Sequence, residues 1–165
     1  MQELIRRADA WLKASRPDYY AILRPGVDDA ALAAYEARFG LVLPTDLKQL
    51  YRWRDGQDLR PSMALVHNHM FVPLSHSASD KEMLDGMIGA DFDDPAWWRR
   101  GWVPFTESFG SDHYCVDLEV EGGGTPGQVI DFWHDEPTRN VIASSFAGWF
   151  RKLVVAMEEG RLELA

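Results

Sequence analysis

The sequence has little cysteine and no long apolar run. Its single cysteine, Cys115, excludes an internal disulfide and any multi-cysteine zinc site, so nothing indicates an oxidising compartment. No apolar run approaches the roughly 18 to 20 residues that a membrane-spanning helix requires. The first residues mix Arg6, Arg7 and Asp9 with apolar side chains, unlike the unbroken apolar block of a signal peptide. We therefore expect a cytoplasmic chain that does not cross a bilayer.

Positive charge is also scarce. The formal net charge is -9, and residues 80–136 hold 14 acidic against 3 basic residues, a net of -11. Such a field repels phosphate backbones, which argues against nucleic-acid binding, and it speeds encounter with a basic protein. On charge alone, a contribution to solubility is the favoured interpretation.

The apolar residues that are present follow helical spacing in five places. A chain of 165 residues with 46% hydrophobic content can form one domain, residues 1–165, around one core. Caps, glycines and prolines then bound the predicted helices. The first three helices cover residues 1–15, Asp28 or Asp29 to Gly40, and Thr45 or Asp46 to Asp55-Gly56. The fourth begins with a capping box at Ser79–Glu82 and reaches Ile88. The fifth begins at Ser144 or Ser145 and carries the last apolar stripe of the chain. That stripe is Phe146, Trp149, Phe150, Leu153, Val154 and Met157.

Alternating or short apolar runs predict strands between these helices. They cover residues 102–105, 113–120, 128–134 and 139–143, with shorter pieces within residues 57–75. The glycine-rich stretch at residues 121–127 is typical of a hairpin loop and lacks the ending of a phosphate-binding loop. The pattern predicts an α+β fold, with N-terminal helices packed on a mainly antiparallel sheet and a C-terminal helix closing it.

Three segments of the chain, taken in order, match the motifs of a known family. The first is Leu43-Pro44-Thr45-Asp46-Leu47-Lys48, followed by Leu50-Tyr51 and Asp55-Gly56. The second is Trp102-Val103-Pro104-Phe105, followed by Gly110-Ser111-Asp112 and the strand that ends near Asp117. The third is Gly127-Gln128-Val129-Ile130, followed by Val141–Phe146 and an aromatic helix. In this order, over about residues 28–155, they resemble the SUKH superfamily, named after the Smi and Knr cell-wall regulators of fungi and abundant among bacterial immunity proteins. Asp55 stands where asparagine is commoner in the family.

The resemblance implies a binding scaffold and not an enzyme. Bacterial members typically neutralise a toxin, often a basic nucleic-acid-targeting protein, and an acidic inhibitor would complement such a surface. The leading hypothesis from the sequence is therefore an immunity protein that binds a cognate toxin. The alternative is an intracellular scaffold or regulatory protein-binding module, as the fungal relatives suggest.

No set of residues makes a complete catalytic or metal site in the sequence. His67 and His69 lie two apart and could share a metal ion on a strand, but no third ligand is visible nearby, which favours a solvated loop. Asp91 to Asp94 lack the spacing of a calcium loop. Cys115 has no partner that would lower its pKa and is interpreted as an inert thiol. We expect no catalytic residue, no metal and no cofactor.

The hairpin of residues 113–134 offers the strongest candidate surface. If Val120 pairs with Gln128, Asp117 lies opposite Asp131 and Cys115 opposite Trp133, with both carboxylates on an outward face. Two carboxylates beside an indole could receive a partner's Arg or Lys, carry out acid and base chemistry, or only bond the adjoining turn. The candidate partner-binding residues are Asp91, Asp93, Asp94, Asp112, Asp117, Glu119, Asp131 and Trp133.

Overall fold

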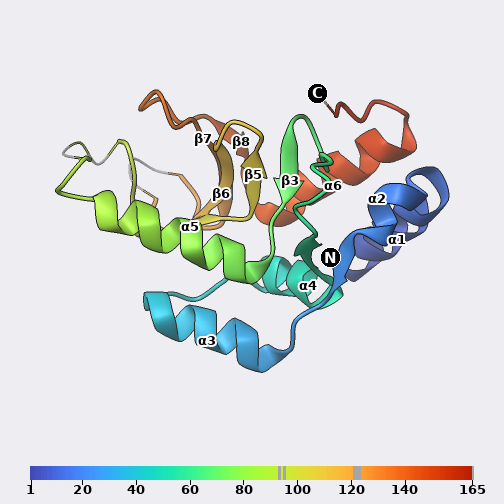
Figure 1. The fold of residues 1–165 in the computed structure, drawn as a ribbon, viewed down its shortest axis with the longest axis horizontal. Coiled ribbons are helices and arrows are strands. Elements are labelled where there is room, and N and C mark those ends of the chain that lie inside the picture. Colours follow the sequence, from blue (N-terminus) through green and yellow to red (C-terminus); the bar gives the residue numbers. More distant parts are fainter. Residues whose placement is uncertain (93, 95, 121–123, 165) are drawn as a thin grey trace.

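The chain folds as an α+β domain in which helices surround short antiparallel sheets (Figure 1). This computed structural model describes residues 1–92, 94, 96–120 and 124–164. It confirms the predicted fold class, with N-terminal helices, antiparallel strands and a C-terminal helix that contacts the first one.

The N-terminal helices begin and end close to their sequence signals. They are α1 (Gln2–Ser15), α3 (Asp29–Phe39) and α4 (Thr45–Trp53); the short α2 (Pro17–Ala21), which was not predicted, follows α1. The Asp28 carboxylate caps α3 by accepting a hydrogen bond from the Ala31 amide, and Gly40 ends that helix in a left-handed conformation with φ of 64°. The helix therefore has the two ends that its sequence predicts.

The Asp55-Gly56 pair has a different role from the predicted turn. It belongs to strand β2 (Arg54–Gln57), which pairs with β1 (Leu23–Pro25). Gly56 has φ of +66°, and a Cβ there would lie 2.4 Å from the backbone of Val72 and Pro73. Asp55 Oδ1 accepts a hydrogen bond of 2.7 Å from the Leu74 amide. The pair thus anchors the start of the next helix.

That helix, α5 (Leu74–Met87), begins before the predicted capping box. The prediction that this box starts the helix is therefore wrong. Ser79 lies inside the helix, where its hydroxyl donates to the Ser75 carbonyl. Because Asp55 satisfies the Leu74 amide from outside, the helix can start without a local cap. Further along α5, the buried Lys81 ammonium bonds the Arg100 carbonyl and Asp85, fixing the helix to the following loop.

In the part of the chain that the structure describes, the strands form one larger and two smaller sheets. The four-stranded sheet is antiparallel in the order β4 (Trp102–Pro104), β6 (His113–Asp117), β7 (Gln128–Phe132) and β8 (Val141–Ala143). A two-stranded sheet pairs β3 (His69–Phe71) with β5 (Thr106–Ser108). The strand β5 was not predicted, since Thr106–Ser108 has no apolar alternation.

Both faces of the four-stranded sheet are covered. Val103, Val116 and Val129 belong to the main core with α6 (Phe146–Glu158), whose six predicted stripe residues are all buried. Cys115 and Ile130 face the other way, into a second cluster. This cluster also holds Leu84, Trp98, Trp102 and Phe132. The face of β6 that carries Cys115, which was predicted to face solvent, is therefore buried.

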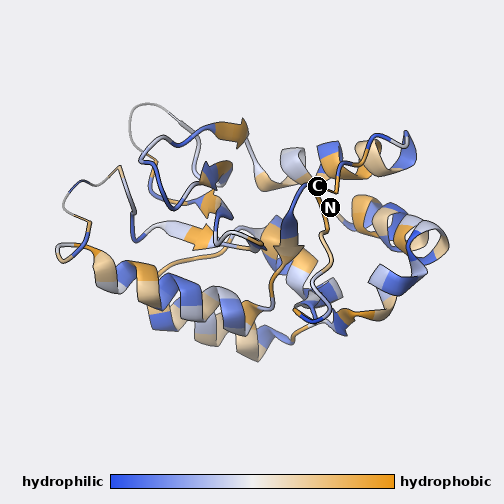
Figure 2. Cartoon of the chain, turned by 45° about the horizontal axis from the view of Figure 1, so that its top comes forward, coloured by the Kyte–Doolittle hydropathy of each residue, from blue (hydrophilic) through white to orange (hydrophobic). Residues whose placement is uncertain are grey.

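The helices carry hydrophilic and hydrophobic residues side by side, as the mixed blue and orange of Figure 2 shows. Helix α6 lies beside α1 (Figure 1), where Arg7 forms an ion pair with Glu158. Among the described residues, every helix is too short or too polar to span a bilayer.

Candidate partner-binding surface

The β6–β7 register differs from the one that the sequence predicts. Asp117 faces Gln128, Cys115 faces Ile130 and Tyr114 faces Asp131. Since neighbouring residues of a strand alternate between faces, Asp117 and Asp131 point to opposite faces of the sheet. The predicted pair of carboxylates beside Trp133 is therefore wrong. The physical cause is that β6 ends at Asp117, where the chain bends and the Asp117 side chain accepts a hydrogen bond from the Glu119 amide, so the strand stops before Val120.

Asp117 and Asp131 are buried and organise neighbouring backbone. Asp117 accepts hydrogen bonds from the Glu119 amide at 3.0 Å and from the Gln128 side chain at 2.9 Å. Asp131 accepts from the Asn140 amide at 2.7 Å and from the Asn140 side chain at 2.9 Å. Asp117 thus holds the connection between β6 and β7, Asp131 holds the segment before β8, and both carboxylates are used in internal contacts.

Asp112 is also buried, and it ties two loops together. Its Oδ1 accepts hydrogen bonds from His134, at 3.1 Å from the backbone amide and at 2.7 Å from Nδ1. Its Oδ2 accepts from the Ser108 hydroxyl at 3.1 Å. The turn of residues 108–112 is thereby fixed to the segment that follows β7. Asp112 therefore positions the backbone of both loops.

The Asp112–His134 contact changes the acidity of both groups. Burial pushes the pKa of Asp112 up, but hydrogen bonds from His134 and Ser108 outweigh it and leave the pKa below its ordinary value. The hydrogen bond to Asp112 raises the pKa of His134 above its ordinary 6.5, although His134 is open to solvent. The pair is therefore favoured in its charged form.

Two exposed aromatic side chains lie on the segments that Asp112 joins. Phe109 is 55% exposed and comes from the turn, and Trp133 is 40% exposed and directly precedes His134. The Phe109 amide also donates to the Asn68 carbonyl, so its backbone is held from two sides. Large apolar side chains on a fixed backbone are typical anchors of protein interfaces. Trp133 was predicted as such an anchor, and Phe109 was missed.

Two loops that Arg139 connects carry exposed acidic residues. Asp91 and Asp94 are exposed in one loop, and Asp135 and Glu136 are exposed in another. Arg139 connects the two loops: its guanidinium donates to the Glu136 carbonyl at 2.5 Å and to the Trp97 carbonyl at 2.9 Å. We call Phe109, Trp133, Asp91, Asp94, Asp135 and Glu136 the aromatic-acidic surface.

Two further candidates lie elsewhere. Glu119 is exposed on a different loop, where its Oε2 accepts a hydrogen bond of 3.0 Å from the Gly101 amide. Asp93 lies outside the described residues. Asp91, Asp94 and Trp133 are therefore exposed on the two segments that Arg139 connects, and the remaining described candidates lie in internal or separate contacts.

The two histidines considered as metal ligands have different environments. His69 is buried in β3, where Nδ1 bonds Thr106 and the ring stacks on Tyr114 with centroids 3.9 Å apart. His67 is exposed in the preceding turn and faces Glu163. They do not form a ligand pair, and only His67 matches the predicted solvated loop.

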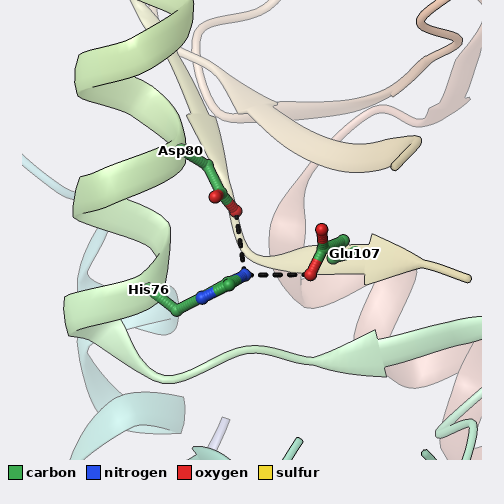
Figure 3. Close-up of side chains that lie close together, drawn as sticks. All are labelled: His76, Asp80 and Glu107. Carbon is green, nitrogen blue, oxygen red and sulfur yellow. Dashed lines mark hydrogen bonds and ion pairs between the residues drawn. The ribbon is translucent and has the colours of Figure 1, made fainter. Parts of the chain in front are cut away.

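A different cluster brings potential metal ligands together: His76, Asp80 and Glu107 (Figure 3). The hydrogen bond to Glu107 raises the pKa of His76, and the same bond lowers the pKa of Glu107. Burial raises the pKa of Asp80. The sequence carries part of this signal, since His76 and Asp80 are four residues apart, but Glu107 comes from the unpredicted strand β5.

Cys115 is fully buried in the second apolar cluster. Burial raises the pKa of its thiol well above the ordinary value, which disfavours the reactive thiolate. The thiol is packed in the core, and its lack of reactivity stays a prediction.

Comparison with known proteins places these features in a family. The profile of the SMI1 / KNR4 family (SUKH-1) matches residues 26–152. The chain is 23% identical over 98% of its length to a cell wall biosynthesis and cell cycle regulator of Schizosaccharomyces pombe, covering 37% of that protein. It is also 23% identical over 96% of its length to a KNR4/SMI1 homologue of Debaryomyces hansenii, covering 35% of it.

A glucan synthesis regulatory protein of Neurospora crassa is 22% identical over 94% of this chain, which covers 38% of that protein. The chain thus spans little more than a third of the length of these curated relatives. The family profile, in contrast, covers most of the chain, including the Leu-Pro helix, the Asp-Gly strand and the four-stranded sheet. The chain belongs to the SMI1/KNR4 (SUKH-1) family.

Proposed function

We propose that this chain is a regulatory protein-binding module that docks a basic partner and has no catalytic activity of its own. The observation that carries the proposal is the aromatic-acidic surface, where Phe109 and Trp133 are exposed on segments fixed by the buried Asp112. Such a surface needs little ordering on binding, so the entropic cost of docking is small.

The names of the relatives support this class of function. The relatives from S. pombe and N. crassa are described as regulators of cell-wall biosynthesis and glucan synthesis, respectively. The matched region makes up 37% and 38% of these two proteins. The buried Cys115 also leaves the most reactive side-chain type of this chain without access to a substrate.

Affinity capture from the native cells tests the proposal. Wild-type bait is compared with the Trp133→Ala and Phe109→Ala variants and with Val42→Ala, which truncates another exposed apolar side chain, 75% exposed, on the α3–α4 connection. We expect a basic protein to be captured by wild type and Val42→Ala and to be depleted about tenfold by the surface variants. Equal capture by all four baits, each folded by circular dichroism, would contradict the proposal.

The charge of -11 over residues 80–136 favours a second candidate, a toxin-neutralising immunity protein. It predicts a neighbouring gene for a large secreted protein with a toxic C-terminal domain. Co-expression of this chain should then restore growth of cells producing that domain, and the Trp133→Ala variant should restore it less well. The absence of such a neighbouring gene would contradict the immunity proposal. The regulatory module would then remain.

A further inference from the structure

Three side chains from two elements converge beside the start of α5. His76 and Asp80 are four residues apart on α5 and so share one helical face, and Glu107 reaches them from β5 (Figure 3). His76 Nε2 lies 2.9 Å from a Glu107 oxygen and 3.4 Å from Asp80 Oδ2. The three potential ligand atoms all lie within 4.8 Å of one another.

The hydrogen bonds in this cluster leave one carboxylate oxygen without a donor. A single imidazole nitrogen faces both carboxylates, and its hydrogen bond goes to Glu107. Asp80 Oδ2 is buried and accepts no hydrogen bond from any residue that the structure describes. A buried oxygen of this kind is costly unless a cation or another donor satisfies it. Two carboxylates around one imidazole therefore indicate a place for further positive charge.

The spacing fits a small divalent ion. Zinc binds imidazole nitrogen and carboxylate oxygen at about 2.0 to 2.2 Å, so neighbouring ligand atoms of a tetrahedral site are about 3.3 Å apart. The two distances from His76 Nε2 already bracket that value. We propose that His76, Asp80 and Glu107 bind one divalent metal ion of the zinc type through three protein ligands, with at least one coordination position open.

The cluster is held in place and can be reached from solvent. The Ser77 hydroxyl donates to the Pro104 carbonyl at 2.5 Å, tying α5 to the chain just before β5. Asp55 fixes the first amide of α5, so both ligand-bearing elements have defined positions. His76 also lines an open groove with Ser75, Ser79, Arg24, Arg60 and neighbouring residues, which gives an ion a path to the ligands. A bound ion would join α5 to β5.

Calorimetric titration of Zn²⁺ into the full, chelator-treated chain tests the site. Glu107→Gln keeps the side-chain shape but removes the charged ligand, and Asp80→Asn does the same on α5. His134→Ala is the control, because it removes an exposed histidine that bonds a carboxylate outside the cluster. We expect one equivalent of Zn²⁺ to bind wild type and the control. Both ligand variants should bind at least about tenfold more weakly, since even losing a residue that only orients a ligand costs this much.

A second measurement separates metal binding from folding. Zn²⁺ should raise the thermal denaturation midpoint of wild type and of His134→Ala, and it should leave that of Glu107→Gln unchanged, because a ligand stabilises only the state that binds it. Absence of saturable Zn²⁺ binding to wild type would overturn the proposal. So would unchanged affinity in both ligand variants. Because the proposed protein-docking surface lies on other residues, failure of either proposal leaves the other in place.

Discussion

Asp112 joins two loops through hydrogen bonds to His134 and Ser108 and is itself buried. The exposed residues next to its partners, Phe109 and Trp133, are the ones that a binding protein could reach. The buried acid therefore fixes the backbone, and the exposed aromatic side chains are available for contact.

The acidity of His134 reports directly on this contact. Its raised folded-state pKa means that the pair stabilises the fold fully below the ordinary pKa of 6.5 and loses this contribution as pH rises through the folded value. The lowered pKa of Asp112 means that its contribution is present above the ordinary 3.8 and is lost as pH falls through the folded value. The pair is thus fully formed between about pH 3.8 and 6.5.

An NMR titration of the His134 ring should give a pKa above 6.5 in wild type and a value closer to 6.5 in Asp112→Asn. The substitution removes the charge and keeps the side-chain volume. The same His134 pKa in both proteins would show that Asp112 does not hold the ring, and the proposed loop arrangement would lose its main link.

At the scale of single residues, exposure could be predicted from the sequence at some positions and not at others. Trp133 was predicted to be exposed, and it is; its role as a binding anchor stays a prediction. Asp117 and Asp131 were expected on an outward face, yet both are buried, because the register depends on where β6 ends. β6 ends in a bend where the Asp117 side chain bonds the Glu119 amide, and the alternating pattern of residues 113–120 gives no sign of that bend.

Among the elements, α6 could be predicted almost completely. Ser145 caps it by accepting a hydrogen bond from the Gly148 amide, and its apolar stripe lies entirely in the core. Its start signal and its burial signal are both local in sequence. The start of α5 depends instead on Asp55, and strand β5 depends on pairing with β3, so both required the tertiary structure.

The packing of α6 leads to a stability prediction. Leu153 is 5% exposed and belongs to the core that α6 forms with the N-terminal helices. Truncation by Leu153→Ala should lower the free energy of unfolding by about 2 to 5 kcal/mol, through lost apolar contact and the cavity left behind. Arg151→Ala, on the exposed side of the same helix, is the control and should change little. Urea denaturation followed by circular dichroism measures both; an unchanged midpoint for Leu153→Ala would mean that α6 is not docked.

Over the whole molecule, charge is distributed unevenly. Residues 1–60 carry 10 basic and 9 acidic residues, whereas residues 80–136 have a net charge of -11. Four exposed acids of this region, Asp91, Asp94, Asp135 and Glu136, belong to the aromatic-acidic surface. An uneven field of this kind orients a basic partner before contact and acts mainly on the association rate.

Association kinetics test the central claim, that a basic partner docks on the aromatic-acidic surface. The captured partner is mixed with wild type, with the Asp135→Lys and Glu136→Lys double variant, and with an Asp18→Lys and Asp58→Lys control that changes the net charge equally. We expect the first variant to associate about tenfold more slowly, with a flatter dependence on ionic strength, while the control stays close to wild type. Equal rates and equal salt slopes for both variants would contradict the account.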